Sequence, residues 1–542
     1  RQKREPAMSI HAVSNEIKTE SVWADSARRP TFPKLEHNIE TDVCIVGAGI
    51  AGLTTAYLLT QSGKSVVVLD DGAIGGGMSE VTSAHLASAI DDRYVEIERL
   101  HGQQGAKLAA ESHSRAIDQI ETIVNKEKIN CDFDRIDGYL FLGEGQKEDL
   151  LDRELEATHR AGLTGVEKVV YAPIKSFDSG PALRFPNQGQ FHPLKYLSGL
   201  AKCIARDGGQ IFLKSHAEQV DGGSPAKIKV GKHTIKAGAV VVATNVPIND
   251  LVAIHTKQAA YLTYVIAARV PAGAVPKALY WDTEDPYHYI RLQDLPRSRG
   301  NGSASKQEQP GGQPAESDEQ LLIVGGEDHR TGHATDTHER HARLEFWARQ
   351  RFPMMGPLEY TWSGQVMETI DGLAFIGRNP MDKDNVFIVT GDSGMGLTHG
   401  TIAGMLLTDL IIGRENPWEE LYSPSRKTLR AAGEFIKEGI STTAPYLDWV
   451  TGGDVSSESE IAKECGAILR RGLSKVAVYR DQQGKLHEMS AVCPHLDCIV
   501  RWNGTEKTWD CPCHGSRFDK LGQVLNGPAN SPLAPLEEER KK

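Results

Sequence analysis

Residues 493–514 bring four cysteines and two histidines together in one short segment, CPHLDCIVRWNGTEKTWDCPCH. Cys493 and His495 form a C-x-H pair, and Cys511 and His514 form a C-x-x-H pair fifteen residues further on. Each pair offers one thiolate and one imidazole, as required by a [2Fe–2S] centre with two cysteines on one iron and two histidines on the other. Zinc is the alternative, but zinc ribbons and fingers usually present C-x(2–4)-C knuckles instead.

Short strand patterns surround this segment, among them KVAVYRD, HEMSAVC, IVRWN, KTWDC and SRFD. They predict a small antiparallel β module over 461–542, preceded by a linker over 421–460. The segment resembles Rieske domains, down to the run CPCHGS. The resemblance implies that Cys493, His495, Cys511 and His514 hold the cluster and that Cys498 and Cys513 form a disulfide between the two ligand loops.

Two residues after the last histidine bear on the redox potential of the cluster. In Rieske proteins of the cytochrome bc type, a serine and a tyrosine donate hydrogen bonds to the cluster sulfurs. Ser516 matches the serine, but Phe518 stands where the tyrosine would be and has no hydroxyl group. We therefore expect a potential below that of bc-type clusters, within the Rieske range of roughly −150 to +300 mV.

A nucleotide-binding pattern lies near the other end of the chain, in TDVCIVGAGIAGLTTAYLLTQSGKSVVVLDD. An apolar strand leads into Gly47, Gly49 and Gly52, a helix follows, and a second strand ends at Asp70. Such glycines let the backbone approach a pyrophosphate at the helix N-terminus, and the acidic residue binds ribose hydroxyls. Only one such fingerprint is present, which disfavours an NADH-driven ferredoxin reductase, because an enzyme that used both FAD and NADH would need a second one.

A second glycine-rich turn follows the strand pattern at 386–389, in VFIVTGDSGMGLTHGTIAGMLLTDLI. With the first motif, AVVVATN (239–245) and YTWSGQVMETIDGLAFIG (360–377), it resembles the D-amino-acid oxidase/glycine oxidase superfamily. The resemblance implies an α/β fold, in which a D-amino-acid-oxidase-like Rossmann domain carries an inserted antiparallel-sheet substrate domain, joined here to a small all-β Rieske domain.

The same resemblance assigns the segments and the FAD contacts. FAD-binding segments are expected at about 41–90, 190–250 and 360–420 of a unit spanning 41–420, with the substrate domain at about 91–189 and 251–359 and an N-terminal extension over 1–40. The expected FAD contacts are Gly47, Gly49, Gly52, Asp70, Thr82, Ser83, Ala217, Gly391, Asp392, Gly394, Met395 and Gly396. His85 is either an ordinary packing residue or, as in some relatives, a covalent flavin link.

Two strand patterns, 259–270 and 286–292, are candidates for the substrate sheet. Alternation places Tyr287, Tyr289 and Arg291 on one face. An arginine flanked by tyrosines is suited to bind a substrate carboxylate, because guanidinium binds carboxylate in a bidentate way. The alternative is that this face points to solvent or to a partner strand.

Two other stretches carry less chemistry. The Gly-, Ser-, Pro- and Gln-rich segment 296–320 predicts a long solvated hairpin insertion. The histidines at 329, 333, 338 and 341 are candidates for a metal site, but a charged, solvated helix is the favoured interpretation. The sequence also offers nothing that completes a two-histidine, one-carboxylate iron site.

The composition excludes several classes of partner. A formal net charge of −11 argues against nucleic acid and anionic lipid. No apolar run approaches the length of a membrane span, and the basic start lacks the apolar core of a secretory signal. We expect a cytoplasmic protein.

These patterns together predict a flavin-dependent oxidoreductase that oxidises the C–N bond of a small amine or amino acid. FAD would accept a hydride, and the [2Fe–2S] cluster would pass electrons one at a time to an external carrier. One alternative is the reverse flow, from an external donor through the cluster to the flavin, for a reductive or oxygen-using reaction. Another is a non-catalytic redox sensor or electron-transfer module.

Overall fold

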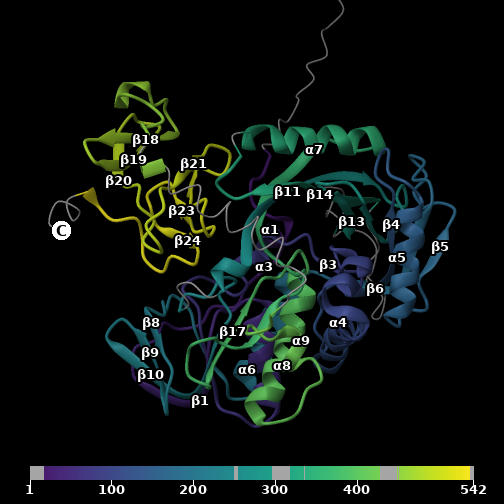
Figure 1. The fold of residues 1–542 in the computed structure, drawn as a ribbon, viewed down its shortest axis with the longest axis horizontal. Helices are drawn as coiled ribbons and strands as arrows, with labels where there is room; N and C mark the ends of the chain where they lie inside the picture. Colours follow the sequence, from purple (N-terminus) through teal and green to yellow (C-terminus); the bar gives the residue numbers. More distant parts are fainter. Residues whose placement is uncertain are drawn as a thin grey trace, which may run out of the picture.

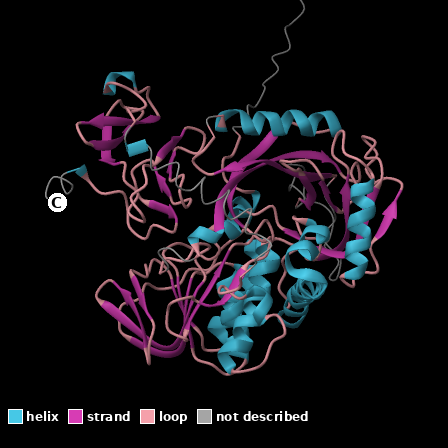
Figure 2. Ribbon diagram, viewed as in Figure 1, coloured by secondary structure: helices cyan, strands magenta, loops and turns pink. Residues whose placement is uncertain are grey.

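The structure is a computed structural model that describes residues 17–249, 254–295, 318–334, 336–427, 448–449 and 451–536. Most of the expected insertion at 296–320, and much of the expected linker at 421–460, lie outside these residues. The described chain forms an N-terminal unit (17–427) built on two sheets and a C-terminal module (451–536) of short strands (Figures 1 and 2). No helix in the described ranges has both the length and the apolar character needed to cross a membrane.

The first sheet of the N-terminal unit carries the nucleotide-binding pattern. Its strand order is β16–β17–β10–β1–β2–β7, and the pairings among β17, β10, β1, β2 and β7 are parallel. The strands run over β1 Ile39–Val46, β2 Val66–Leu69, β7 Gln210–Phe212, β8 Gln219–Asp221, β9 Ala226–Val230, β10 His233–Val242, β16 Phe375–Arg378 and β17 Val386–Thr390. Parallel strands are buried on both faces, which explains why β2, β17 and the second half of β1 are nearly continuous apolar runs.

Helices pack together against this sheet. Helix α2 (Ile50–Gln61) contacts both α6 (Pro193–Arg206) and α8 (Gly396–Ile412), which Figure 1 places beside β1 and β17. Gly404 of α8 allows the close approach, because a Cβ at this position would meet Thr54 of α2. Helix α9 (Glu419–Tyr422) follows α8 and contacts α4, since the Tyr422 hydroxyl group lies 2.7 Å from that of Ser112.

The second sheet forms the roof above the first. Its order is β15–β11–β14–β13–β12–β4–β6–β3, with β5 paired to β6, and all pairings are antiparallel except that of β4 with β12. The strands run over β3 His85–Leu86, β4 Asp134–Phe141, β5 Glu167–Val169, β6 Ala182–Gln190, β11 Gln258–Pro271, β12 Leu279–Asp282, β13 Tyr289–Asp294, β14 Glu319–Arg330 and β15 Leu358–Thr369. A large, mainly antiparallel sheet is therefore present, as the predicted fold class requires.

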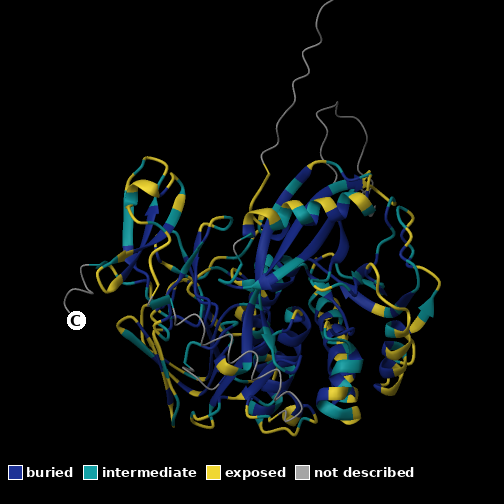
Figure 3. Ribbon diagram, turned by 45° about the horizontal axis from the view of Figure 1, so that its top comes forward, coloured by how far each residue is buried: buried dark blue, intermediate teal, exposed yellow. Residues whose placement is uncertain are grey.

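Several helices contact strands of this sheet: α3 (Met78–Val81) contacts β15, α5 (Asp149–Arg160) contacts β5 and β6, and α7 (Thr337–Arg351) contacts β11 and β14. Helix α4 (Arg93–Glu127) packs mainly against α5 and α8. Figure 3 shows the exposed side of α7 turned outward and its buried side turned toward β11 and β14. Helix α4 is interrupted at Gly102, whose φ of +73° is non-helical.

One predicted strand begins later than expected. The pattern at 286–292 predicted a strand from Pro286, but β13 begins at Tyr289. The cause is a turn closed by the Asp282 carboxylate, which accepts hydrogen bonds from the backbone N–H groups of Glu284 (3.1 Å) and His288 (2.9 Å). Tyr287 therefore belongs to the turn, and of the three residues only Tyr289 and Arg291 lie in the strand, where they share one face.

Part of the expected N-terminal extension belongs to the core. Helix α1 (Val22–Ser26) is capped by Ser21, and Trp23 is fully buried. The Trp23 indole N–H donates to the carbonyl oxygen of Thr82 at 2.7 Å. The extension therefore supports a segment that we expected beside the flavin.

The C-terminal module is the predicted antiparallel structure. One sheet contains β18 (Cys465–Arg471), β19 (Ser474–Arg480) and β20 (Leu486–Ser490). The other contains β21 (Arg501–Asn503), β22 (Thr508–Asp510), β23 (Arg517–Asp519) and β24 (Val524–Asn526). The short helix η4 (Glu458–Glu460) precedes them. In Figure 1 the second sheet lies on the side of the module that faces the N-terminal unit.

Candidate flavin site and iron–sulfur centre

A cavity of about 600 Å³ lies between the two sheets of the N-terminal unit. Ten of the residues expected to contact FAD line this cavity, although they come from segments far apart in the sequence. They are Gly47, Gly49, Asp70, Thr82, Ser83, Ala217, Asp392, Gly394, Met395 and Gly396. The other two, Gly52 and Gly391, are not among the lining residues.

The first glycine loop can accept a pyrophosphate. Gly47 has a φ of +112°, and a Cβ there would collide with the carbonyl oxygen of Ala243 at the end of β10. Gly52 packs behind the loop, since a Cβ there would collide with the carbonyl oxygen of Gly47. Helix α2 begins after Gly49, and the N–H of Ile50 donates to the Ser79 hydroxyl at 3.1 Å. The dipole at this helix start still favours an anion.

Asp70 joins the end of β2 to this loop. Its carboxylate accepts hydrogen bonds from the backbone N–H groups of Ala48 and Gly72, each at 2.7 Å. Burial raises the pKa of Asp70, while these two hydrogen bonds oppose the shift. A carboxylate fixed in this way at the cavity wall can accept hydrogen bonds from the ribose hydroxyls of an ADP group.

The second glycine loop joins β17 to α8. Gly391 has a φ of +72° and packs against Thr369, whereas Gly394, Met395 and Gly396 reach the cavity. Helix α8 begins without a side-chain cap. The N–H groups at its start can therefore bind the carbonyl edge of an isoalloxazine ring. The two loops together fit FAD, with one anion-binding helix start for each half of the cofactor.

Acidic side chains line the opposite part of the cavity, below the substrate sheet. Asp91 is open to the cavity and accepts a hydrogen bond from the Tyr287 hydroxyl at 2.8 Å. Enclosure by the protein raises the pKa of Asp91 to about 7, and burial raises that of Asp328 to about 6. The pKa of Glu368 is raised as well, first by burial and then by the neighbouring carboxylates. The described residues that line the cavity include no lysine or arginine.

The two tyrosines expected at the substrate reach this region. Tyr287 and Tyr289 line the cavity, and their rings lie 5.6 Å apart. The Tyr289 hydroxyl lies 2.7 Å from that of Thr263. One oxygen of Asp328 is buried and has no hydrogen-bond partner within the described ranges. Polar groups from β13, β14 and the preceding turn therefore converge on the same space.

Arg291 does not reach the cavity, although it was expected to bind a carboxylate there. Its side chain is fully buried and donates hydrogen bonds to the carbonyl oxygens of Ala84 (2.7 Å) and Phe191 (3.2 Å). Its guanidinium lies 5.1 Å from the ring of Trp23, and burial lowers its pKa to about 9. Arg291 lies two residues after Tyr289 on the same face of β13, at a position that α1 covers.

The histidines discussed above have separate environments. His85 lines the cavity, and its Nε2 lies 3.2 Å from the carbonyl oxygen of Ile290. His329 stacks on Tyr264, His341 contacts the carbonyl oxygen of Trp362, and His338 is exposed on α7. His333 lies 3.0 Å from the carbonyl oxygen of Pro512 in the C-terminal module. The last four form no metal-binding group in the described chain.

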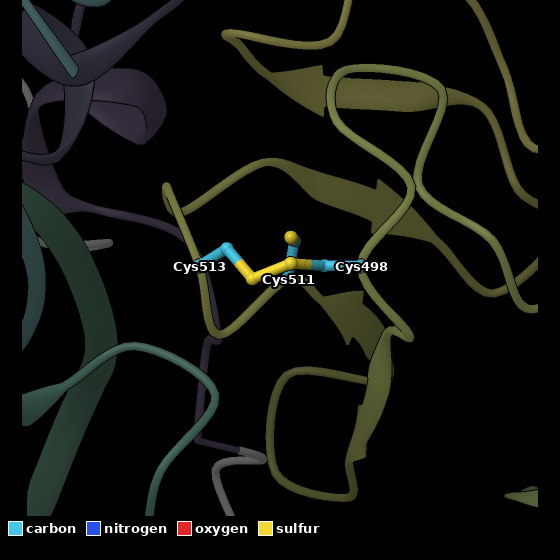
Figure 4. Close-up of side chains that lie close together, drawn as sticks. All are labelled: Cys498, Cys511 and Cys513. Carbon is cyan, nitrogen blue, oxygen red and sulfur yellow. A yellow bond between two sulfur atoms is a disulfide. The ribbon is translucent and has the colours of Figure 1, made fainter. Parts of the chain in front are cut away.

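The two ligand loops of the C-terminal module meet at its surface. Cys498 and Cys513 form the expected disulfide, and the sulfur of Cys511 lies within 4.8 Å of both (Figure 4). Cys493 and Cys511 are buried free thiols, and the rings of His495 and His514 lie 5.0 Å apart. Both ring nitrogens of His495 lack a hydrogen-bond partner within the described part of the chain. Two thiols and two imidazoles at this place fit a [2Fe–2S] cluster.

Hydrogen-bond donors surround the ligand sulfurs. The hydrogen bond from the Cys511 thiol lowers the pKa of Cys493, burial opposes it, and the backbone N–H of His495 and the Ser516 hydroxyl lower it further. Ser516 also accepts a hydrogen bond from the backbone N–H of Ala529 at 3.0 Å. Phe518 is fully buried in the core of the module and brings no hydroxyl.

The cluster loops lie directly against the N-terminal unit. The Gln365 amide donates to the carbonyl oxygen of Gly515 at 2.7 Å, and a Cβ on Gly515 would collide with Ala260 of β11. His255, in the short helix η1 (His255–Lys257), has its ring centroid 4.7 Å from that of His495 and 5.8 Å from that of His514. No local pattern in the sequence marks Gln365 or His255 as functional.

Comparisons with known families cover both parts of the chain. Residues 42–410 match the model of the FAD dependent oxidoreductase family, and residues 454–537 match that of the Rieske [2Fe-2S] domain. The first therefore binds FAD, and the second binds a [2Fe–2S] cluster. The matched residues contain both glycine loops and all four cluster ligands.

Individual proteins resemble the chain over different lengths. A Rieske 2Fe–2S iron–sulfur protein of Bacillus subtilis, YhfW, is 31% identical over 525 residues, which cover 96% of this chain and 97% of the relative. The gamma-glutamylputrescine oxidoreductase of Escherichia coli is 25% identical over 408 residues, covering 73% of this chain and 89% of the relative.

Solved structures show the same fold in the N-terminal unit. Glycine oxidase from Geobacillus kaustophilus has a TM-score of 0.54 at 16% identity and covers 72% of this chain and 99% of its own. L-proline dehydrogenase from P. horikoshii has a TM-score of 0.55 at 17% identity and covers 72% and 98%. With its glycine loops lining one cavity and its cysteine–histidine loops docked beside that cavity, the chain belongs to the FAD-dependent oxidoreductase family and carries a C-terminal Rieske [2Fe–2S] domain.

Proposed function

We propose that this protein is an amine dehydrogenase that oxidises the C–N bond of a small cationic amine and passes the electrons to an external one-electron carrier. Bound FAD supplies the hydride acceptor, and the bound cluster supplies a one-electron carrier. The amine would lose a hydride from the carbon next to nitrogen and a proton from nitrogen. Water would then hydrolyse the resulting imine to an aldehyde or ketone, with ammonia released from a primary amine and a smaller amine from a secondary one.

The contact between Gln365 and Gly515 carries this proposal. Gln365 lines the FAD cavity, and its hydrogen-bond partner is the residue directly after the cluster ligand His514. His255 approaches the cluster histidines from the same unit. A short path through packed side chains supports exchange of electrons between the two cofactors without movement of the Rieske domain.

The charge of the cavity supports a cationic substrate. Asp91, Asp328 and Glu368 lie near one another at the substrate end, and none of the described residues that line this cavity is a lysine or arginine. An adjoining cavity shares the three carboxylates and is also lined by Arg93, Arg99 and Arg153. Arg291 is held elsewhere by backbone carbonyl groups. A diamine or polyamine therefore matches the cavity better than an amino acid does. The relative that acts on gamma-glutamylputrescine, by its name, agrees with an amine substrate.

Asp91 is the group that we assign as base. An ammonium group must lose a proton before hydride can leave the adjacent carbon, and a base works best when its pKa lies near the working pH. The raised pKa of Asp91, about 7, meets this condition. Tyr287 donates a hydrogen bond to this carboxylate and would hold it in place.

Anaerobic stopped-flow measurements on the protein with both cofactors bound test the proposal. Diamines, polyamines, monoamines and amino acids are mixed with the oxidised protein, and the flavin and cluster absorption bands are followed separately. We expect diamines or polyamines to bleach the flavin first and the cluster afterwards. Bleaching by amino acids alone would contradict the cationic-amine assignment. Failure of every amine, with an external donor reducing the cluster before the flavin, would support the reverse flow of electrons instead.

A further inference from the structure

The FAD cavity is closed at one end by the Rieske domain. Its lining passes from Asp70 and Asp71, directly after β2, through Ser215–Ala217, to residues of the C-terminal module. The contributing residues of that module are Val524, Leu525, Asn526, Gly527, Ala529 and Asn530. Since Asp70 marks the ribose end of the cavity, this segment faces the place of the adenosine.

We propose that segment 524–530 of the Rieske domain is part of the FAD-binding site, covers the adenosine half, and couples FAD binding to docking of the iron–sulfur domain. The inference depends neither on the substrate nor on the direction of electron flow. It concerns how this chain holds its cofactor.

Hydrogen bonds join the segment to the adenosine end. The Asn530 amide donates to the carbonyl oxygens of Ala217 (3.0 Å) and Glu218 (3.2 Å). The His216 Nε2 lies 3.2 Å from the Asn530 carbonyl oxygen, and its Nδ1 lies 3.2 Å from the Asp71 carboxylate. The network therefore runs from the Rieske domain to the residue next to Asp70.

Close packing continues on the other side of the segment. A Cβ on Gly527 would lie 3.5 Å from the carbonyl oxygen of Val246, in the loop that follows β10. Ala243, Thr244 and Asn245 of that loop also line the cavity. The segment thus lies between the loops that follow β7 and β10, where an adenosine bound by Asp70 would be enclosed.

Leu525 indicates the kind of contact that the segment makes. Its side chain lines the cavity, yet 53% of the residue is exposed. A purine ring placed against it would remove apolar surface from water. Leu521, in the preceding turn of the same domain, is similarly exposed at 48% but does not line the cavity.

The coupling follows from this shared site. If docking of the Rieske domain tightens FAD binding, FAD must tighten docking by the same factor. The same domain places Gly515 against Gln365, which also lines the cavity. FAD binding would therefore also hold the cluster loops beside the substrate sheet.

Matched leucine variants of the full-length chain test the proposal. FAD is removed, and its re-binding is measured by the quenching of FAD fluorescence. Leu525→Asp replaces the apolar side chain at the cavity wall with a carboxylate where we expect the purine ring, so FAD binding should be at least about tenfold weaker, equivalent to the loss of about 1.4 kcal/mol. Leu521→Asp adds the same charge outside the cavity and should bind FAD as the wild type does. Iron content and the cluster circular dichroism check that the Rieske domain remains folded in both.

Hydrogen exchange on the unmodified protein gives a second measurement. With FAD removed, addition of ADP should protect the backbone amides of 524–530 from exchange, because ADP carries the adenosine half alone. The exposed turn around Leu521 should not change. Equal FAD affinity of the two leucine variants, or no protection of 524–530 by ADP, would overturn the proposal.

Discussion

Gln365 of strand β15 and Gly515 of the cluster-binding loop are joined by a buried hydrogen bond of 2.7 Å. Gln365 lines the flavin cavity, and Gly515 follows the cluster ligand His514 in the chain. The same glycine packs so closely on Ala260 that no larger residue fits there. The two redox sites of this protein are thus held together by a specific contact between their domains, in addition to the covalent connection.

Gln365→Leu should weaken this contact without changing the shape of the side chain greatly. The carbonyl oxygen of Gly515 would be left buried without its donor, a loss that typically costs ~1–3 kcal/mol. We expect slower transfer between flavin and cluster, with the rate of flavin bleaching by substrate little changed. Stopped-flow traces at the two absorption bands measure these rates separately.

A matched control is Gln320→Leu, since Gln320 makes hydrogen bonds at the far end of β14, with Asp294 and Gly273. It should leave both rates unchanged. If Gln365→Leu and Gln320→Leu show the same transfer rate, the contact does not govern electron exchange.

Local patterns predicted the glycine loops, which the structure brings to one cavity, and the cysteine–histidine loops, which it brings together in the Rieske domain. The turn at Gly47–Gly52, the loop at Gly391–Gly396 and the two cysteine–histidine pairs each depend on residues close together in the sequence. Spacing alone therefore constrains their geometry. The predicted disulfide between Cys498 and Cys513 is confirmed.

The substrate end could not be predicted in the same way. Alternation correctly puts Tyr289 and Arg291 on one face of a strand, but it does not say how far along the strand the cavity extends. Trp23, from a segment remote in sequence, covers the position of Arg291. Contacts such as that of His255 with His495 join distant segments without a local pattern, so only the folded chain reveals them.

Arg291→Leu distinguishes a structural arginine from a substrate clamp. The substitution removes donors from the carbonyl oxygens of Ala84 and Phe191, and each unpaired buried acceptor costs ~1–3 kcal/mol. We expect a lower Tm by differential scanning calorimetry, with the preference for diamines over amino acids unchanged. A selective loss of activity toward carboxylate-bearing substrates, at unchanged Tm, would instead assign Arg291 to binding of the substrate carboxylate.

Phe518→Tyr should raise the reduction potential of the cluster. A hydroxyl at this position could donate a hydrogen bond toward a cluster sulfur, and such bonds stabilise the reduced, more negative cluster. Phe518→Leu, which also keeps the position apolar, is the control and should leave the potential near that of the wild type. A redox titration followed by EPR measures all three proteins, and equal potentials for the tyrosine and leucine variants would refute the prediction.

Asp91→Asn should remove one limb of the pH profile. The pKa of Asp91 is raised to about 7, chiefly by its enclosure, and only the deprotonated carboxylate can accept the proton of a substrate ammonium group. In the wild type, the rate of flavin bleaching should therefore rise as the pH increases through about 7 and level off above it. In Asp91→Asn the rate should be lower by ~10²–10⁴-fold, the usual contribution of a general base, and should lose this rise.

Tyr287→Phe removes the hydrogen bond to the carboxylate at 2.8 Å but keeps the base. Because that hydrogen bond stabilises the ionised form, its loss should shift the limb to higher pH without abolishing it. A variant series in which Asp91→Asn keeps the limb would assign the base to another carboxylate of the cavity, with Asp328 the next to test.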